Sequence, residues 1–326
     1  MRFLKSKTTN PYFNIATEEY LLKNFNHDFF FLYINEPSII VGKHQNTMAE
    51  INVPFTIENN LKVVRRLSGG GTVFHDAGNL NYCFIQNGKE GFLVDFKKYT
   101  QPILNTLQNI GVNAYLRGKS DLVIDDLKFS GNAEHVYRKK ILHHGTLLFD
   151  SELSKLNEAI KTDWSKFDDK AVRSTRSKVT NICSHLKSPL GIKQFRDKVF
   201  EEVQSNNTDF EEYILTESDF IEIEKLIANK YQTWDWNFGY SPKYKLAQSI
   251  DIDGKILSSK IEIDKGVIVR AKLLINNTEN NVLNSLSTLL INEKHAHESL
   301  FSLVDGFLKQ FPEVQFTTKN IIQALF

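Results

Sequence analysis

The stretch RRLSGGGTVFHDAGNLNYCF, residues 65–84, joins two arginines and three consecutive glycines to an alternating apolar run. Adjacent glycines carry a steep cost in conformational entropy, so a folded chain keeps them where backbone needs positive φ or must approach another group closely. Arg65 and Arg66 supply fork-shaped donors that suit phosphate or carboxylate. The stretch matches neither the P-loop nor the G-x-G-x-x-G pattern. It predicts either a tight hairpin beside surface arginines or a loop that binds an anionic ligand.

The bulk composition is that of an ordinary globular protein. The chain has 326 residues, of which 41% are hydrophobic and 24% are charged, and its net charge is +1. A near-neutral charge argues against nucleic acid or an anionic membrane as partner. The first residues lack the apolar core of a signal peptide, and no window approaches 18 apolar residues. We therefore expect a soluble, cytoplasmic protein that acts as a monomer.

Apolar spacing predicts a mixture of helices and strands throughout the chain. A basic stretch, residues 164–180, is poor in large apolar residues and predicts a mobile surface segment. Asp125-Asp126 and Asp253-Gly254 predict hairpin turns, and Ser151 is expected to cap the helix that follows it. The predicted helices are 11–24, 99–110, 191–205, 217–231, 281–291 and 297–310. The predicted strands are 29–34, 38–41, 61–64, 72–74, 80–85, 112–116, 122–124, 141–149, 247–252, 256–263 and 266–274.

After Pro242 the pattern restarts with a strong hairpin signal, a third strand and two helices. This is the pattern of a self-contained α+β unit of about 80 residues. We therefore expect a large domain over residues 1–243 and a small C-terminal domain over residues 244–326.

Several residues could carry chemistry, and each also has an ordinary structural interpretation. Lys128 leads into a small-residue turn, where its ammonium could hold a carboxylate beside a phosphate or could simply be a solvated charge. His75 and Asp76 are adjacent on a predicted strand, so they face opposite ways and are not expected to form a dyad. The same argument separates His143 from His144 and excludes a zinc site there.

The two cysteines do not form a disulfide framework in a chain of this length. Cys83 lies in an apolar strand and is expected to be inert. Cys183 has His185 nearby, so it is either a nucleophile or a buried cysteine with a structural role only.

Together and in this order, the motifs resemble the lipoate–protein ligase A family. The resemblance spans about the first 242 residues, and its most specific part is RRLSGGGTVFHD followed by KFSGNA and HHGTLL. Residues 234–242 look like the family's closing segment of the large domain. The motifs are NPYFNIATEEYLL (10–22), PSIIVGKHQN (37–46), RRLSGGGTVFHDAGNLN (65–81), KFSGNA (128–133), HHGTLL (143–148) and VRSTRSKVTNI (172–182).

The resemblance implies an α/β (α+β) fold, with a biotin/lipoate-ligase-like catalytic domain of mixed sheets and flanking helices plus a small α+β accessory domain. It implies a two-step ligase in which lipoate and ATP, with Mg²⁺, give lipoyl-AMP and pyrophosphate. The lipoyl group then passes to a lysine of a lipoyl domain, in the acyltransferase (E2) subunit of a 2-oxoacid dehydrogenase or in glycine-cleavage H protein.

The resemblance also implies roles for individual residues. Lys128 is expected to be the catalytic residue, in contact with both the lipoyl carbonyl and the α-phosphate. Asp121 is the candidate ligand for Mg²⁺, and residues 172–180 look like the loop that closes over the adenylate. The residues implied to contact ATP or the adenylate are Arg66, Gly71, Thr72, Val73, Phe74, Lys128, Ala133 and His144. Those implied to contact lipoate are Lys128, Gly70, Gly71, His75 and Asn79.

The sequence departs from the family at two points. Lys119 and Ser120 stand where the family usually has arginine and asparagine, and Leu67 stands where some members carry a further arginine. The main rival function is an ATP-independent acyltransferase that moves octanoyl or lipoyl groups through Cys183. A second rival is a noncatalytic protein on the same fold that binds acyl carriers or senses lipoate. The presence of Lys128 and Arg66 favours the ligase over both.

Overall fold

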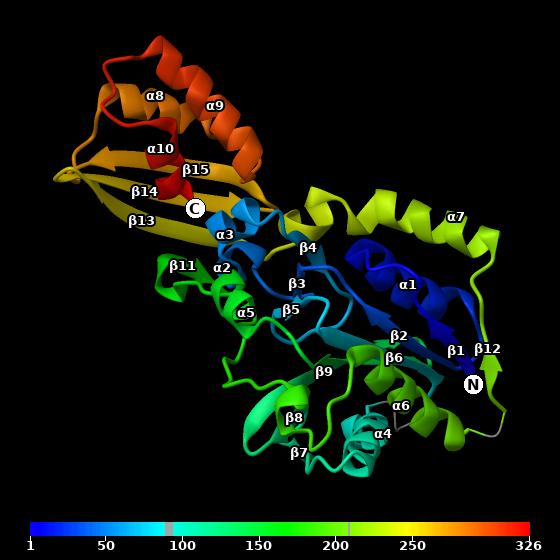
Figure 1. Cartoon of the computed structure of the whole chain (residues 1–326). Coiled ribbons are helices and arrows are strands. Elements are labelled where there is room, and N and C mark those ends of the chain that lie inside the picture. Colours follow the sequence, from blue (N-terminus) through cyan, green and yellow to red (C-terminus); the bar gives the residue numbers. More distant parts are fainter. Residues whose placement is uncertain (89–93, 208) are drawn as a thin grey trace. The chain divides into compact units, whose positions relative to one another are not determined.

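The computed structural model describes residues 1–88, 94–207 and 209–326, which form two compact units (Figure 1). The larger unit contains Met1–Lys43, Phe55–Ile160 and Ser174–Thr233. The smaller unit contains His44–Pro54, Lys161–Arg173 and Trp234–Phe326. Each unit is thus assembled from three pieces of chain. The division into domains 1–243 and 244–326 stays a prediction.

The larger unit is built on an eight-stranded mixed sheet of order β12-β1-β2-β6-β10-β9-β8-β7 and a three-stranded sheet of order β4-β3-β5. With their flanking helices, these sheets confirm the predicted fold class. The strands are β1 (Arg2–Lys5), β2 (Phe29–Ile34), β3 (Ser38–Val41), β4 (Lys62–Arg65), β5 (Val73–His75), β6 (Asn79–Asn87), β7 (Tyr115–Arg117), β8 (Asp121–Ile124), β9 (Leu127–Tyr137), β10 (Lys140–Leu148) and β12 (Glu211–Glu212). The helices are α1 (Pro11–Asn24), α4 (Phe96–Asn109), α5 (Leu153–Ala159), α6 (Ile192–Ser205), α7 (Glu217–Leu226), the short η2 (Ile182–His185) and the π-helix η3 (Ile227–Tyr231).

The central strand β2 is apolar on both faces because both faces are covered. Phe30 and Leu32 belong to the core cluster that α4 and α6 complete from one side of the sheet. The alternate residues Phe31 and Tyr33 are also buried, and α1 contacts β2, β6 and β10. A strand covered on both sides reads as an uninterrupted apolar run rather than as an alternation.

Helix α1 is buried over most of its surface because it also contacts α7, η3 and β4, a strand of the second sheet. Its start follows from sequence: the Asn10 side chain accepts the Tyr12 N–H at 3.0 Å, and Pro11 occupies the first turn, where no intrahelical donor is needed. The burial includes two carboxylates, Glu18 and Glu19, each only 2% exposed. Buried carboxylates require partners, and those of Glu18 lie close to the glycine stretch.

The predicted hairpin at Asp125-Asp126 is confirmed. Both residues have positive φ, 49° and 62°, and they join β8 to β9 as a two-residue turn. The predicted strand 112–116 begins too early, because the Val112 N–H still bonds to Leu107 O and the strand starts only at Tyr115.

The predicted capping role of Ser151 is wrong. Helix α5 begins at Leu153 with Glu152 as N-cap residue, and no side chain of its own turn caps it. Instead Asp76, distant in sequence, accepts the Glu152 N–H at 2.7 Å. The Ser151 hydroxyl is buried without a hydrogen-bond partner among the described residues.

The smaller unit is a four-stranded antiparallel sheet of order β11-β13-β14-β15. Helices α8, α9 and α10 gather on one side of this sheet, where α8 contacts β15 and α10 contacts β13 and β14 (Figure 1). Within the described residues, no helix is both long and apolar enough to cross a membrane. The elements are α2 (Thr47–Glu50), η1 (Trp164–Lys166), β11 (Phe167–Asp169), η4 (Asp235–Gly239), β13 (Tyr244–Ile252), β14 (Lys255–Asp264), β15 (Val267–Ile275), α8 (Asn281–Leu289), α9 (His297–Gln310) and α10 (Thr318–Leu325), while α3 (Val53–Glu58) spans the division between the units.

Candidate active site

The glycine loop, residues 66–72, crosses from one side of β3 to the other. Strands β4 and β5 flank β3, so the chain between them passes over the end of β3. Two backbone bonds fix the crossing: the Arg66 N–H donates to Val41 O at 3.0 Å, and the Lys43 N–H donates to Ser68 O at 2.9 Å. The stretch is therefore a loop over a strand end and not a tight hairpin.

The Arg66 side chain holds this loop from within. Its Nη2 donates to Gly69 O at 2.7 Å and to Gly71 O at 2.8 Å. Its Nη1 donates to Ile40 O at 3.1 Å, and its Nε donates to Ser68 Oγ at 3.0 Å. The guanidinium thus binds the loop carbonyls, whereas the resemblance implied contact with ATP.

Burial lowers the pKa of Arg66 to about 10, while the nearby Glu18 and Tyr33 act in the opposite direction. The guanidinium therefore keeps its positive charge at neutral pH, although Arg66 is only 6% exposed. A buried charge of this kind adds positive potential to the loop that encloses it.

The glycines are needed where the loop is crowded. Gly70 has φ +87°, and a Cβ there would lie 3.1 Å from Arg66 Nη2 and 3.9 Å from Ala133 Cβ. A Cβ on Gly71 would lie 3.0 Å from Ser174 Oγ and 3.2 Å from Ser174 Cα. The structure thus brings Ala133, on β9, and Ser174 up to the loop.

Thr72, Val73 and Phe74 continue the loop into β5. Thr72 is buried and its N–H donates to Ser174 Oγ at 2.9 Å. Val73 and Phe74 pair with Ile40 and Ile39 of β3. Of these three residues, Val73 is partly exposed, and Thr72 and Phe74 are buried.

Lys128 lies at a bulge between β8 and β9. Its Nζ pairs with Asp121 Oδ1 at 2.9 Å, and each side chain keeps 24% of its surface exposed. Gly131 makes room for the amine, since a Cβ there would lie 3.3 Å from Lys128 Nζ. The structure therefore joins two predicted site residues, the catalytic lysine and the candidate magnesium ligand, in one ion pair.

The basic segment packs against Lys128 through its backbone. The Lys128 N–H donates to Lys178 O at 2.9 Å, and the Thr180 N–H donates to Lys128 O at 3.0 Å. Together with the Ser174 contacts, these bonds connect residues 174–180 both to the lysine and to the glycine loop. The sequence singled out this segment for its basic residues, but the contacts are made by its backbone and by a serine.

His75 and Asn79 stand at the two ends of the turn between β5 and β6. Asn14 Nδ2 donates to Asn35 Oδ1 at 2.8 Å, which fixes the orientation of the Asn35 amide. Asn35 Nδ2 lies 2.9 Å from His75 Nδ1 and therefore donates to it. Since Nδ1 accepts, the hydrogen of the His75 ring belongs on Nε2. His75 Nε2 and Asn79 Oδ1 are buried without hydrogen-bond partners among the described residues. Orphaned buried polar atoms of this kind mark a place for a ligand or an ordered water.

Burial, with Arg66 and His144 adding to the effect, lowers the pKa of His75 to about 3. The ring is therefore neutral in the physiological range and can act as a hydrogen-bond donor but not as a charge. Its neighbour Asp76 bonds instead to the Gly78 and Glu152 N–H groups. The absence of a His75–Asp76 dyad agrees with the sequence argument.

His144 lies behind the glycine loop. It is 8% exposed, and its Nε2 lies 2.6 Å from Ser68 Oγ while its Nδ1 lies 2.8 Å from Glu18 Oε2. Its neighbour His143 points the other way, to Glu134 Oε1 at 2.8 Å. The opposite orientation of the two rings was predicted from strand alternation.

Sequence reasoning missed three residues that shape the site: Glu18, Ser68 and Asn132. Asn132 Nδ2 donates to Ser120 O at 2.9 Å and so fixes the residue before Asp121. The Tyr82 hydroxyl donates to Asn132 Oδ1, and Gly145 permits this approach because a Cβ there would clash with both side chains. The signals for Asn132 and Ser68 were their places inside KFSGNA and RRLSGGG.

The cysteines do not have the surroundings of a nucleophile. Burial, followed by the nearby Asp150, raises the pKa of Cys183, and its Sγ lies 3.4 Å from Asp150 Oδ1. His185 bonds to Thr180 Oγ1 at 2.9 Å. Burial raises the pKa of Cys83 well above its usual value. A thiol activated for catalysis needs the opposite shift.

Across residues 1–88, 94–207 and 209–326, no group of three or more His, Cys, Asp or Glu side chains could hold a metal ion. Magnesium bound to a nucleotide needs only one or two carboxylates, since the phosphates supply the other oxygens. Lys128 and Ser120 both contact Oδ1 of Asp121, so Oδ2 is the oxygen suited to a cation. Asp121 therefore fits the metal site that the resemblance implies.

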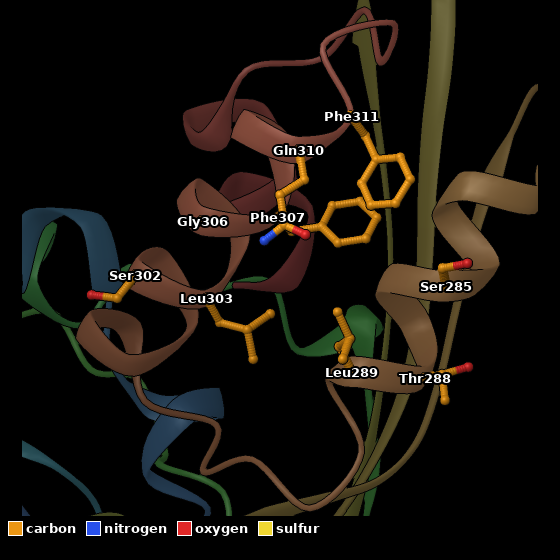
Figure 2. A pocket seen from close by; sticks show the side chains of 9 residues that line it. All are labelled: Ser285, Thr288, Leu289, Ser302, Leu303, Gly306, Phe307, Gln310 and Phe311. Carbon is orange, nitrogen blue, oxygen red and sulfur yellow. The ribbon is translucent and has the colours of Figure 1, made fainter.

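The smaller unit has a pocket of its own, of about 560 Å³, between α8 and α9 (Figure 2). Leu289, Leu303, Phe307 and Phe311 form its apolar part, and Ser285, Thr288, Ser302 and Gln310 are neutral polar residues around them. A pocket without charged side chains does not suit ATP. All the predicted site residues lie in the larger unit.

Comparisons with known proteins agree with the geometry. The family model for the lipoyl protein ligase A/B catalytic domain matches residues 10–204, more than half of the chain. A lipoate–protein ligase 1 of Staphylococcus aureus is 41% identical, over 84% of this chain and 84% of the relative. The lipoate–protein ligase LplJ of Bacillus subtilis is 36% identical, over 94% of each chain.

Three solved structures share the fold. The chain resembles Plasmodium falciparum LipL1 in complex with lipoate, with a TM-score of 0.61, 24% identity and coverage of 99% of this chain and 97% of that chain. A lipoate–protein ligase A bound with ATP gives a TM-score of 0.62, 22% identity, and coverage of 73% and 98%. A bipartite ligase of Thermoplasma acidophilum, studied with its E2 lipoyl domain, gives a TM-score of 0.64, 22% identity, and coverage of 73% and 96%. From its sequence relatives and its matched catalytic domain, this chain belongs to the lipoate–protein ligase family.

Proposed function

We propose that this protein is an ATP-dependent lipoate–protein ligase. In the first step the lipoate carboxylate attacks the α-phosphorus of ATP, lipoyl-AMP forms, and pyrophosphate leaves. In the second step a lysine amine of a lipoyl domain attacks the acyl carbonyl, an amide forms, and AMP leaves. The relatives named lipoate–protein ligase support this activity, and the structure described with ATP supports the nucleotide.

One observation carries the proposal most directly. Lys128 is a half-buried amine beside Asp121, and its own peptide N–H and carbonyl bond to the segment that also touches the glycine loop. A positive charge held there reduces the repulsion between the lipoate carboxylate and the α-phosphate and stabilises charge in the transition state. We assign Lys128 as the catalytic residue on this basis.

Around Lys128, we propose that Gly71, Thr72, Val73, Phe74 and Ala133 border the adenylate, and that Gly70, His75 and Asn79 lie against lipoate. The orphaned His75 Nε2 supports this, since it can donate to an oxygen of the acyl group. We propose that Arg66 and His144 hold the glycine loop in place, through the carbonyls of Gly69 and Gly71 and through the Ser68 hydroxyl. Asp121 would hold Mg²⁺, which neutralises phosphate charge when bound.

The domain division, the location and the oligomeric state are proposed from the sequence. We propose residues 1–243 as the catalytic domain and 244–326 as the accessory domain of a cytoplasmic monomer. The T. acidophilum ligase studied with its E2 lipoyl domain supports a lipoyl domain as the acceptor here. Glycine-cleavage H protein is the other candidate acceptor.

The test is lipoate-dependent release of pyrophosphate from ATP, with octanoate and biotin as parallel acids. Release with lipoate, followed by a mass increase of an apo-lipoyl domain, is the expected result. The rival acyltransferase predicts no release and a loss of activity in Cys183→Ser. We expect Cys183→Ser to keep most of the activity, because its thiol is not activated.

A further inference from the structure

A chain of four buried side chains links helix α1 to the glycine loop. Arg66 Nε lies 3.0 Å from Ser68 Oγ, Ser68 Oγ lies 2.6 Å from His144 Nε2, and His144 Nδ1 lies 2.8 Å from Glu18 Oε2. All four residues are buried, the most exposed being His144 at 8%. The chain joins α1, β10 and the loop, which are far apart in sequence.

The direction of every hydrogen bond follows from its two ends. A guanidinium only donates and a carboxylate only accepts. In the neutral form of His144, the Nδ1 hydrogen therefore points to Glu18, and Nε2 accepts the Ser68 hydroxyl hydrogen. Ser68 Oγ then accepts from Arg66 Nε. The other acceptor near that hydroxyl, Gly69 O at 3.5 Å, is much farther away than His144 Nε2.

The orientation of Arg66 in turn determines how two peptide groups of the glycine loop are turned. Arg66 Nη2 binds the carbonyls of Gly69 and Gly71. In a planar trans peptide the N–H points opposite to the C=O, so these two bonds turn the N–H groups of Gly70 and Thr72 away from Arg66. Thr72 confirms the geometry, because its N–H meets Ser174 Oγ on that other side. A backbone N–H that points out of a loop can hold an anion, and the N–H of the exposed Gly70 is placed to do so.

We propose that Glu18 is a positioning residue for adenylate formation. Its carboxylate orients His144, His144 orients the Ser68 hydroxyl, and that hydroxyl accepts from Arg66. The guanidinium of Arg66 then holds the carbonyls of Gly69 and Gly71. The Gly70 N–H is then turned away from Arg66, and the Thr72 N–H is held by Ser174 Oγ, before ATP arrives. This inference rests on the proposed ligase function and adds a role for a carboxylate that touches neither substrate.

Helix α1 offers a matched control in the next residue. Glu19 is equally buried, at 2%, but it bonds to Lys23, Lys230 and Tyr231 and not to the loop. Glu18→Gln and Glu19→Gln are both isosteric and both remove one buried negative charge. A purely structural role for Glu18 predicts the same outcome for both variants.

The experiment compares the kinetics of pyrophosphate release in the full-length wild type and these variants. We expect Glu18→Gln and Ser68→Ala to lower kcat/KM for ATP by roughly 10- to 100-fold. Ser68→Thr, which keeps the hydroxyl, should recover much of this loss. Glu19→Gln should stay within about 3-fold of wild type. Equal losses in Glu18→Gln and Glu19→Gln would overturn the proposal.

A second readout does not depend on activity. ¹⁵N chemical shifts of the histidine rings, assigned with His144→Gln, report which nitrogen carries the hydrogen. The relay requires the Nδ1–H form of His144, and an Nε2–H form would overturn it. If the wild type releases no pyrophosphate with any acid, the ligase proposal fails, whereas the ring tautomer still decides whether the relay exists.

Discussion

Lys128 is placed by local backbone geometry rather than by a surrounding cluster of charges. The bulge between β8 and β9 directs its side chain to Asp121, and Gly131 leaves the space that the amine occupies. A side chain held by one ion pair and one glycine contributes little to the core. Its replacement should therefore affect the reaction far more than the fold.

We predict that Lys128→Ala lowers lipoate-dependent pyrophosphate release by about 10³-fold or more, since charge stabilisation of this kind is worth several kcal/mol. Its unfolding midpoint should stay close to that of the wild type. Lys119→Ala is the control, because Lys119 is exposed nearby and lies over the Phe96 ring. Near-normal release by Lys128→Ala would contradict the assignment.

His75 should make the protein less stable in acid. Its folded pKa of about 3 lies below the ordinary value near 6.5, so the unfolded chain binds more protons between these pH values. The contribution of His75 to stability is therefore complete above pH 6.5 and declines as pH falls. Between pH 6.5 and 5 the loss amounts to about 2 kcal/mol, at about 1.4 kcal/mol per pH unit.

Urea unfolding at pH 7.5 and pH 5.0 checks this prediction. The stability difference between wild type and His75→Gln should shift in favour of the variant by about 2 kcal/mol at the lower pH, because glutamine takes up no proton. The buried His295 of the smaller unit, whose pKa is lowered to about 4, is unchanged in both proteins and cancels. An identical difference at the two pH values would contradict the prediction.

Among the elements, those with strong local signals were predicted well from sequence. The run FFFLYI gave β2 with both its ends, and two consecutive aspartates gave the β8–β9 turn. The cap of α5 was assigned wrongly because its acceptor, Asp76, belongs to a distant turn. Long-range side-chain bonds of this kind leave no periodicity in the sequence, and the partner of Glu18, 126 positions away, was missed for the same reason.

The segment 174–180 should become more protected when the adenylate site is filled. Its bonds to Lys128 and its Ser174 contact with the glycine loop already place it on both candidate ligand-binding elements. We expect lipoate with a nonhydrolysable ATP analogue to slow hydrogen exchange there by at least 10-fold. Unchanged exchange would remove the idea that this segment closes over the adenylate.

Gly71→Ala tests the same contact from the other side. The new Cβ would lie 3.0–3.2 Å from Ser174, so the segment must move and its exchange without ligand should rise. Gly191→Ala is a matched control, since its Cβ meets only Gln194 Oε1 at an ordinary 3.6 Å. Equal exchange in the two variants would contradict this expectation.

At the scale of the whole molecule, the sequence suggested two parts but not how the chain is shared between them. The hairpin signal after Pro242 identified the sheet of the smaller unit. That unit also takes in residues 161–173, because β11 pairs with β13, and residues 44–54, where Thr47 bonds to Asn237 and Ser241. A strand of three residues, FDD, has no sequence pattern that would assign it to a sheet almost 80 residues later.

This division gives each unit its own spectroscopic signal. All three tryptophans, Trp164, Trp234 and Trp236, lie in the smaller unit, whereas every candidate site residue lies in the larger one. Tryptophan fluorescence therefore reports unfolding of the smaller unit. Hydrogen exchange in β2 and β6, in the core of the larger unit, reports unfolding of that unit.

We predict that lipoate with the ATP analogue stabilises only the larger unit. At a concentration 100 times Kd the gain is about 2.7 kcal/mol, because the ligands bind the folded form alone. Exchange in β2 and β6 should slow accordingly, while the thermal unfolding midpoint followed by tryptophan fluorescence stays within about 1 °C.

Gly306→Ala supplies the opposite control: Gly306 lies within α9, and a Cβ there meets nothing within 4 Å. That variant should raise the fluorescence midpoint by roughly 4 °C through a helix-propensity gain of about 1 kcal/mol, and it should leave pyrophosphate release unchanged. If the ligands instead move the fluorescence midpoint as far as they slow exchange in the larger unit, the two units unfold as one and the prediction is wrong.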